Sequence, residues 1–361
     1  MKNLKREAKT NKQIQLLKSE TVWIGLDVHK KSNHIAVWSS KRDLIATWVT
    51  PSDADLSCKQ LKPLLPNTAG VVYEAGPTGY KLARKLRAAG FSTQVIAPSK
   101  VPRAAGKDAK SDRLDCRNLA MLASHRGMLH PVNIPTEQEE ADRQVLRLRD
   151  QVIKKRRRIK QQIKSFLLFY SLQEPAGLAY WSKRAVGQLR ALEMVEELRF
   201  CLDEMLEELA QLEGNLRRIT ARVSKLSINE RYKEPVQRLR SVPGVGLLTA
   251  MIFCTELTNP GRFTHQRQVA KILGLAPRVT QSGETRREGR LMKSGNARVR
   301  TILVEAAWRW IRLDPTAKTR YQRLLKNTGN PKKAITAMAH KLAIVLWRIT
   351  INQALYHPVA A

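Results

Sequence analysis

Apolar residues gather in short runs over the first hundred residues, and this pattern predicts β-strands. The run TVWIGLDV has the length of a buried strand and carries Asp27 near its end. Two more runs follow at the spacing of hairpin strands, and two others come later, bounded by turn-forming residues. The five predicted strands are residues 21–28, 34–40, 44–50, 70–76 and 92–98.

Helical periodicity fills the intervals between these strands. Residues 53–65 could form a short helix, and residues 78–90 space their apolar positions as a helix does, with Gly90 at the end. A third helix is predicted from about Asp112 to Arg126. The predicted order is therefore β-β-β-α-β-α-β-α, which is typical of an α/β domain with a mixed sheet and helices on its faces.

Beyond this domain the apolar spacing predicts long helices. The segment from about Glu139 to Leu172 is helical and strongly basic. In residues 195–226 the apolar positions alternate in steps of three and four, which is the heptad signature of a coiled coil. Pro175 and Gly177 lie between the two segments. The two helices could form an antiparallel hairpin within one chain, an intermolecular coil, or both.

The last part of the chain is predicted to be a mainly α-helical domain. It opens with a Pro-Gly-Val-Gly turn that contains Gly244 and Gly246. Helix-hairpin-helix DNA-binding proteins use such a turn to hold a phosphate at a helix N-terminus, and the alternative is an ordinary turn between helices. A glycine-rich basic stretch follows at 274–300, in which Ser282 and Gly283 are predicted to lie in a loop. The predicted division is a basic arm at 1–20, the α/β domain at 21–132, a helical coiled-coil domain at 133–234 and a C-terminal domain at 235–361.

Charge indicates the class of partner. The chain carries 65 Lys and Arg against 31 Asp and Glu, a net charge of +34. Such an excess repels itself unless a polyanion neutralises it, so nucleic acid is the leading partner. An anionic membrane surface is the rival, but no apolar run reaches membrane-spanning length and the N-terminus does not read as a secretory signal. The four cysteines form no CxxC pair, which fits a reducing compartment and argues against zinc.

Against this basic background, four carboxylates stand out by their positions. Asp112 and Asp115 are three residues apart and therefore share one face of their predicted helix. Asp27 and Glu74 each lie near the end of a predicted strand. This is the layout of ribonuclease-H-like nucleases, in which carboxylates hold Mg²⁺ ions that stabilise the entering and leaving oxygens of a phosphodiester. Each acid alone could instead be a turn residue, a helix cap or the ion-pair partner of a nearby arginine.

Three stretches of the first domain resemble DEDD-type insertion-sequence transposases. They are IGLDVHK at 24–30, YEAGPTGYKLARKLRAAGF at 73–91 and AKSDRLDCRNLA at 109–120. The stretch from LRSVPGVGLLTA to GNARVRTIL is similar to the C-terminal transposase domain of the same proteins, and the likeness runs from about residue 21 to 350. Serine before Asp112 and cysteine after Asp115 depart from the more common threonine and alanine, but neither change removes a ligand.

The family in question is the Piv-like recombinases, described as bridge-RNA-guided serine recombinases, and the resemblance implies a mechanism. It implies a RuvC-like first domain that binds Mg²⁺ through Asp27, Glu74, Asp112 and Asp115, with Ser282 as the DNA nucleophile in a site assembled between subunits. Donor and target DNA would be selected by a non-coding guide RNA, and a homodimer would pair into a homotetramer. The enzyme would be cytoplasmic, nucleoid-associated and prokaryotic, with no membrane partner.

From the residues alone, Ser282 draws interest through its neighbours. Gly283 permits a close backbone approach to a ligand, and the surrounding arginines could neutralise a scissile phosphate. Ser294, also followed by glycine, is the nearest competitor. Two alternative functions stay open. One is a metal-dependent junction nuclease that uses water, and the other is a non-catalytic nucleic-acid scaffold. The predicted nucleic-acid contacts are Lys154, Lys155, Arg156, Arg157, Arg158, Gly244, Gly246, Arg278, Arg286, Arg287, Arg290, Lys293 and Arg298, although the first five could equally form a solvated helix face.

Overall fold

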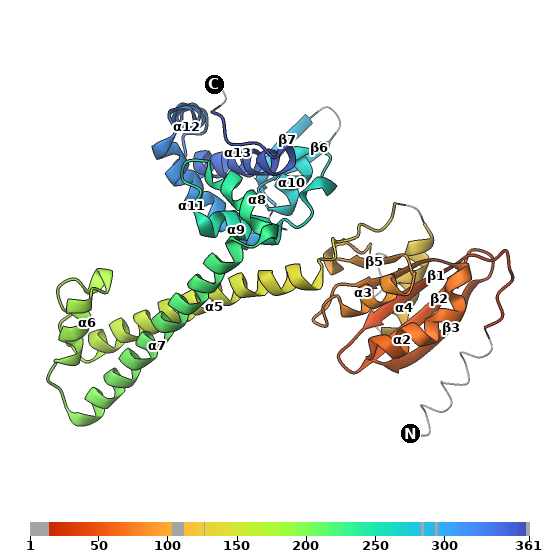
Figure 1. Cartoon of the computed structure of the whole chain (residues 1–361), viewed down its shortest axis with the longest axis horizontal. Coiled ribbons are helices and arrows are strands. Elements are labelled where there is room, and N and C mark those ends of the chain that lie inside the picture. The colour runs from red at the N-terminus through yellow and green to blue at the C-terminus, as the bar shows by residue number, and fades with distance from the viewer. Residues whose placement is uncertain (1–13, 103–111, 126, 283–284, 293–294, 359–361) are drawn as a thin grey trace. The chain divides into compact units, whose positions relative to one another are not determined.

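The structure, a computed structural model, describes residues 14–102, 112–125, 127–282, 285–292 and 295–358. The chain folds into two compact units, Met1–Thr136 and Glu137–Ala361 (Figure 1). The sequence predicted the first boundary four residues earlier, after residue 132. Its second predicted boundary, after residue 234, falls inside the second unit, so a division there stays a prediction.

A five-stranded mixed sheet forms the centre of the first unit. Its strands are β1 (Val22–Val28), β2 (Ser32–Ser39), β3 (Asp43–Pro51), β4 (Thr68–Glu74) and β5 (Thr93–Ile96), in the spatial order β3-β2-β1-β4-β5. The first three strands pair in antiparallel fashion, whereas β4 lies parallel to β1 and β5 lies parallel to β4. The mixed sheet and the order of its elements confirm the prediction, and the strand ends differ by only one or two residues.

Helices cover both faces of this sheet. They are α2 (Ala54–Leu61), α3 (Lys81–Ala88) and α4 (Asp112–Ser124), with short 3₁₀ segments at Lys62–Asn67 and Pro98–Lys100. α2 and α3 pack on the face where Ile24 and Leu26 of β1 are fully buried. α4 covers the opposite face, where its Leu119 packs against Val72 of β4. Because successive side chains of a strand point to opposite faces, alternate residues of each strand face α2 and α3 on one side of the sheet and α4 on the other.

Gly25 on β1 lets the backbone of α4 lie directly against the sheet. A Cβ atom at this position would lie 2.0 Å from the carbonyl oxygen of Cys116 and 2.6 Å from the backbone nitrogen of Ala120. Both atoms belong to the helix backbone, so no side-chain rotation could relieve the overlap. The absence of a side chain at Gly25 therefore positions α4 over β1, two residues before Asp27.

Gly25→Ala is expected to destabilise the first unit by at least about 3 kcal/mol, because the new methyl group would force the strand and the helix apart. Gly70→Ala on β4 is the matched control, since the nearest heavy atom to its Cβ would lie 3.7 Å away, an ordinary contact. Urea unfolding of the two full-length variants, followed by circular dichroism, compares the free energies of unfolding. Equal losses in both variants would contradict the close approach of α4.

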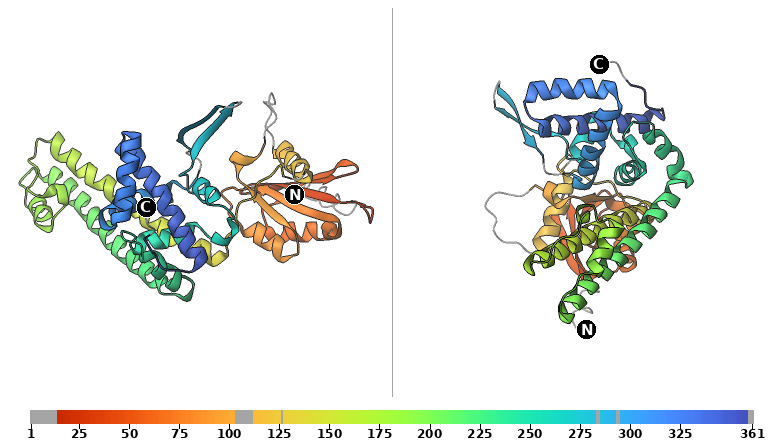
Figure 2. Two further views of the ribbon diagram at one scale, coloured as in Figure 1. Left: turned by 90° about the horizontal axis from the view of Figure 1, so that it is seen from above. Right: turned by 90° about the vertical axis from the view of Figure 1, so that its left-hand side faces the viewer.

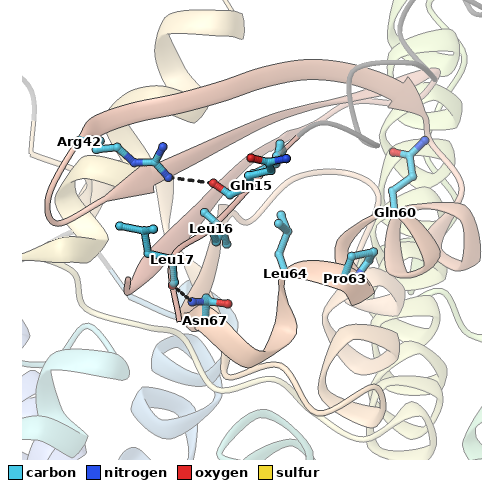
Figure 3. Close-up of a pocket in the computed structure, with 9 residues that line it drawn as sticks. Gln15, Leu16, Leu17, Arg42, Gln60, Pro63, Leu64 and Asn67 are labelled. Atoms are coloured by element: carbon cyan, nitrogen blue, oxygen red, sulfur yellow. Dashed lines mark hydrogen bonds between the residues drawn. The ribbon is translucent and has the colours of Figure 1, made fainter. Parts of the chain in front are cut away.

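Residues 14–20, which the sequence assigned to the basic arm, are tied to the first unit. Arg42 donates hydrogen bonds to the Glu20 carboxylate at 2.8 and 2.5 Å and to a backbone carbonyl of the segment at 3.1 Å. Asn67 donates to another carbonyl of the segment at 2.9 Å (Figure 3). Residues 14–17, Arg42 and Asn67 are among those that line a hollow of 690 Å³. The folded unit thus includes the end of the predicted arm, whose first thirteen residues lie outside the described part of the chain.

Helices make up most of the second unit. The two longest are α5 (Glu137–Phe169) and α7 (Glu196–Ser227), and the short α6 (Lys183–Arg190) precedes α7. The others are α8 (Glu230–Arg240), α9 (Leu247–Glu256), α10 (Gln266–Ile272), α11 (Ala297–Leu313), α12 (Pro315–Thr328) and α13 (Pro331–Asn352), with 3₁₀ segments at Leu178–Tyr180 and Pro260–Arg262. Figure 1 shows α8–α13 gathered at one end of the long helices and α6 at the other.

The expectation that no apolar run reaches membrane-spanning length was wrong for α13, the one described helix that is long and apolar enough to cross a membrane. Its residues Met338, Leu342 and Leu346 are fully buried in the large core that α13 shares with α8, α9 and α11. The apolar character of α13 is thus explained by its place in this core, because a helix that is hydrophobic all round is expected at the centre of a helical domain.

α5 and α7 pack against each other in antiparallel directions. The apolar residues buried between them include Ile159, Ile163, Leu202, Leu206 and Leu209. The Lys160 ammonium lies 3.7 Å from the Glu213 carboxylate, and Arg149 donates a hydrogen bond to Thr220 at 3.0 Å, so residues earlier in α5 meet residues later in α7. The apolar heptad positions of residues 195–226 therefore pack against apolar residues of α5 in the same chain. Supercoiling and an intermolecular coil stay predictions.

A β-hairpin occupies part of the glycine-rich basic stretch. Its strands are β6 (Pro277–Ser282) and β7 (Thr285–Leu291). The prediction of a loop at Ser282 was wrong, because Ser282 is the last residue of β6 and pairs with Thr285. The β-branched Val279 and Thr280 favour a strand, and the Ser-Gly pair that follows is a signal for a tight turn. In both views of Figure 2 the hairpin extends away from the helices of its own unit.

Candidate active site

Asp27 and Glu74 lie at the carboxyl ends of two adjacent parallel strands. Leu26 of β1 pairs with Tyr73 of β4, so the next residue on each strand brings the two acids side by side. Leu26 and Tyr73 are buried on the α2–α3 face. Because successive side chains on a strand point to opposite faces, Asp27 and Glu74 both face α4.

The first turn of α4 carries the other two predicted acids. Asp112 is the first residue of the helix, and its side chain lies outside the described part of the structure. Asp115 is half-buried and precedes Cys116, whose carbonyl oxygen lies over Gly25. Burial raises the pKa of the Cys116 thiol to about 12, and the negative charges of Asp27 and Asp115 add to the rise. Asp27 and Asp115 thus lie within electrostatic reach of one thiol, from opposite sides of the strand–helix contact.

Two histidines outside the predicted set of site residues flank Asp27. His29 Nε2 lies 3.0 Å from Asp27 Oδ2, and the Asp27 side chain is only 18% exposed. His34 is directly opposite Asp27 in the pairing of β1 with β2, and the two imidazole rings meet edge-on with centroids 6.2 Å apart. The spacing Asp-Val-His could have signalled His29. His34 depends on the strand register, which the sequence left open.

The donor set at this edge of the sheet fits a hard cation. Carboxylate oxygens are the ligands that Mg²⁺ prefers, and Asp27, Glu74 and Asp115 come from three elements that share one face. Among the residues whose side chains are described, no group of three or more His, Cys, Asp or Glu is close enough to hold a metal ion. The Asp112 side chain is not among these described side chains. The backbone brings Asp27 and Glu74 to one edge of the sheet, and ligation of a metal ion by all four acids stays a prediction.

Ser282 belongs to the second unit, at the end of β6. Its side chain lies outside the described part of the structure, as do those of Arg286, Arg287 and Arg290 on β7. Arg278 on β6 is exposed. Lys293 and the competing Ser294 lie wholly outside the described residues.

The base of the β6–β7 hairpin is held tightly by its own unit. A Cβ atom at Gly295, whose φ is +133°, would lie 2.5 Å from the backbone nitrogen of Gly274. Asn296 donates its backbone N–H to the carbonyl oxygen of Ile272 at 2.9 Å, and Arg300 donates to the carbonyl oxygen of Gly274 at 3.2 Å. The two ends of the hairpin thus meet at a pair of glycines, which fixes where the strand carrying Ser282 leaves the helical core.

A buried carboxylate joins α5, α9 and the start of α11 beside this hairpin base. The Glu256 side chain is 3% exposed and accepts hydrogen bonds from Arg147, Asn296 and Arg298. Burial alone would raise the pKa of Glu256, but the hydrogen bond from Arg147 and the charges of the nearby arginines hold that pKa below its usual value. Arg298, a predicted nucleic-acid contact, is also paired with Asp150. Its guanidinium is therefore engaged by two carboxylates.

The remaining predicted contacts lie on α5 and in the turn before α9. Lys154, Lys155, Arg157 and Arg158 are exposed on α5, and Arg156 is half-buried. The turn contains two glycines with different surroundings. A Cβ at Gly244, whose φ is +88°, would lie 2.7 Å from the backbone nitrogen of Trp310, so packing against α11 requires this glycine. Gly246 is the N-cap residue of α9 and has open space around it. A phosphate role for the turn stays a prediction.

Comparison with known proteins decides the family. A model of the transposase IS116/IS110/IS902 family matches residues 236–322, and a model of DEDD transposases of the IS110 type matches residues 24–172. The protein named "Putative transposase y4qE" of Sinorhizobium fredii is 32% identical, over 91% of this chain and 88% of that protein. The chain belongs to the IS116/IS110/IS902 transposase family. It is therefore an enzyme that acts on DNA.

Other relatives of this transposase come from further bacteria. The transposase for insertion sequence element IS1533 of Leptospira borgpetersenii is 30% identical, over 80% of this chain and 84% of the relative. The transposase for insertion sequence element IS1111A of Coxiella burnetii is 27% identical, over 79% of each. A structure of RuvC from T. thermophilus in complex with Holliday junction substrate matches with a TM-score of 0.23 and 14% identity, over 31% of this chain and 99% of RuvC.

Proposed function

We propose that this transposase cuts and rejoins DNA through a phosphoserine intermediate at Ser282, and that Asp27, Glu74, Asp112 and Asp115 hold Mg²⁺ for that step. The observation that carries the proposal is the placement of Asp27 and Glu74 side by side at the ends of two parallel strands, under the helix that carries Asp112 and Asp115. Such a set of carboxylates serves phosphodiester chemistry, in a chain whose net charge of +34 favours a polyanion.

The chemistry of the step is an exchange of phosphate esters. Bound Mg²⁺ would neutralise charge on the scissile phosphate and favour deprotonation of the attacking hydroxyl. The Ser282 Oγ forms a bond to phosphorus while the bond from phosphorus to one deoxyribose oxygen breaks. The serine proton passes to a base, and the departing oxygen takes up a proton. Because one phosphate ester replaces another, a deoxyribose hydroxyl of a second strand can reverse the step without an external energy source.

Assembly is part of the proposal, because Ser282 and the acids belong to different units. We place the serine of one subunit with the acids of another in a homodimer that pairs into a homotetramer on DNA. Arg278, Arg286, Arg287, Arg290 and Lys293 would neutralise the phosphates beside the serine. Sedimentation of the transposase with and without DNA tests this assembly, and a monomer on DNA would contradict it.

We further propose that a non-coding guide RNA selects donor and target DNA, in the cytoplasm of a bacterial cell. The exposed cations of α5 support a second nucleic-acid partner, because they lie outside the α/β unit that carries the acids. Sequencing of RNA that co-purifies with the transposase tests the guide directly. Recovery of only abundant cellular RNA would contradict it.

A second candidate function is that of a metal-dependent junction endonuclease. It is favoured by the fact that Asp27 and Glu74 meet within one unit, with no need for Ser282. Water would then attack the phosphate, and no bond between protein and DNA would form. Denaturing gels of reactions with end-labelled DNA separate the two functions, because only the recombinase leaves DNA attached to protein.

Affinity for duplex DNA is expected to fall steeply with salt. Each lysine or arginine that neutralises a phosphate contributes about −0.9 to the slope of log affinity against log salt concentration, because a counterion is released. With about six such contacts, the slope is expected to be about −5. Fluorescence anisotropy with labelled DNA measures this slope between about 50 and 200 mM salt. A flat plot would contradict nucleic acid as the partner of the positive charge.

A further inference from the structure

A basic hollow with an aromatic wall lies on α5, near the end of the long helices where α6 packs. It has a volume of 290 Å³ and is lined by Ile153, Arg156, Arg157, Lys160, Gln161, Lys164 and Trp181. Figure 1 shows α6 beside this part of the α5–α7 pair, and Trp181 stands just before α6 in the chain. This volume is just below the range for ligand pockets, roughly 300–1,000 Å³.

A second hollow continues the first along the same helices. It has a volume of 420 Å³ and is lined by Arg149, Arg156, Glu213, Leu216, Arg217 and Thr220. Arg156 belongs to both linings, so the two hollows adjoin at this residue, and together they are called the basic groove. Glu213 is the only acidic residue in either lining. Two of the lining lysines are already paired, Lys160 with Glu213 at 3.7 Å and Lys164 with Glu174 at 2.9 Å. The four lining arginines leave the groove with an excess of positive charge.

Trp181 is held in place at one end of this groove. Its backbone is left-handed, with φ +55° and ψ +43°, and its N–H is bonded to the carbonyl oxygen of Leu178 at 3.0 Å. The Lys160 ammonium lies 4.8 Å from the centroid of the indole ring. Part of the indole packs against the α5–α7 apolar cluster. Lys160 covers one face of the ring, so a ligand would stack on the other face, and a tryptophan fixed in this way loses little further side-chain entropy when it does.

The cations of the groove crowd one another. Burial lowers the pKa of Lys160, and the positive charge of Arg156 lowers it further. Burial also lowers the pKa of Arg149, and Arg156 again adds to the effect. Among the described residues, neither Arg156 nor Arg157 is within ion-pair distance of a carboxylate. A bound polyanion would relieve this repulsion, and the groove offers it several donors at once.

We propose that this groove binds single-stranded nucleic acid, with a base stacked on Trp181 and the adjoining phosphates held by Arg156, Arg157 and Lys160. Proteins that bind single strands combine a positive groove along the backbone with aromatic side chains under the bases. A duplex hides its bases within the stack, so an aromatic platform has no partner in it. The inference rests on the proposed function in one respect. The single strand held in the groove would be guide RNA or opened DNA that the transposase uses.

The test measures the affinity of the full chain for short labelled single strands, with RNA and DNA of one sequence as separate arms. Trp181→Leu keeps an apolar side chain but removes the aromatic ring, and Trp181→Phe keeps a ring. We expect Trp181→Leu to weaken single-strand binding by about 5- to 100-fold, and Trp181→Phe to restore most of it. Duplex affinity should change by less than about 2-fold. Stronger effects in the RNA arm would assign the groove to RNA, and stronger effects in the DNA arm would assign it to an opened DNA strand.

A second variant guards against a fold defect at Trp181. Arg157 is exposed, so Arg157→Ala leaves the packing of α5 unchanged. Arg157→Ala should make the slope of log affinity against log salt concentration shallower by about one phosphate contact. Lys225→Ala, on the exposed face of α7, is the control and should leave this slope unchanged. Wild-type affinity in both Trp181→Leu and Arg157→Ala would overturn the inference. Strand transfer by the wild type is measured in parallel. If transfer is absent but single-strand affinity falls as expected, the proposed function fails and the groove stands.

Discussion

Ser282→Ala is expected to lower the rate of strand transfer by at least about 1,000-fold while leaving DNA affinity unchanged. Removal of a nucleophile abolishes the covalent step, and what remains comes from binding and electrostatic stabilisation alone. The loss should appear in the rate of transfer, because the serine hydroxyl adds little to the binding of the DNA backbone. A strand-transfer assay on donor and target DNA measures the rate, and filter binding measures the affinity.

Ser294→Ala is the matched control for this prediction. Ser294 has the same Ser-Gly context and the same basic neighbourhood in the sequence. Ser294→Ala is expected to transfer strands at close to the wild-type rate. If Ser294→Ala loses transfer and Ser282→Ala keeps it, the nucleophile has been assigned to the wrong serine. If both variants transfer strands normally, the transposase uses water or another residue.

Asp115→Asn is expected to lower strand cleavage by at least about 100-fold, because it removes a negative charge and a proposed metal ligand without changing the size of the side chain. The variant should fold normally. In the wild type, Mg²⁺ should raise the unfolding temperature, since a ligand that binds only the folded state stabilises it. This rise should be smaller in Asp115→Asn, which gives a readout independent of cleavage.

Asp55→Asn controls for the loss of a carboxylate in the same unit. Asp55 is 72% exposed on α2, on the opposite face of the sheet from α4, and pairs with Lys85 at 2.8 Å. An exposed pair of this kind contributes at most about 1 kcal/mol, so the variant should fold and cleave much as the wild type does. Normal cleavage by Asp115→Asn would show that Asp115 is not part of the active site.

The sequence predicted the first unit well because its strands are encoded locally. Apolar runs and turn residues located all five strands, and the mixed order of elements followed from them. The sequence could not predict how closely α4 approaches β1, because Gly25 and Cys116 lie far apart in the chain and only the folded backbone brings them together. Nor could it place His34 opposite Asp27, since that depends on the strand register.

Prediction was weaker in the second unit, where long-range contacts dominate. Arg298 was expected to contact nucleic acid because it lies in a basic stretch, yet its partners Asp150 and Glu256 are remote in sequence and could not be foreseen. The strand ending at Ser282 was missed because glycines and charges suggested a loop. Charge patterning locates a basic stretch, but only the fold decides which cations are paired.

The heptad pattern gave the right helix and left its partner open. The spacing in 195–226 predicted a long apolar seam, and α7 covers Glu196–Ser227. A seam of this kind can pack equally well on a helix of the same chain or of another. In the structure α5 packs on it, with Ile163 and Leu206 both buried between the two helices. Periodicity alone cannot distinguish these partners, because both bury the same face.

The most direct test of the account is to trap and map the bond between protein and DNA. Wild-type transposase is incubated with labelled donor DNA and Mg²⁺, denatured and digested, and the peptide that carries DNA is identified by mass spectrometry. An adduct is expected at Ser282 in the wild type, and it should be absent in both Ser282→Ala and Asp115→Asn. Cleaved DNA without any adduct, or an adduct at another residue, would contradict it.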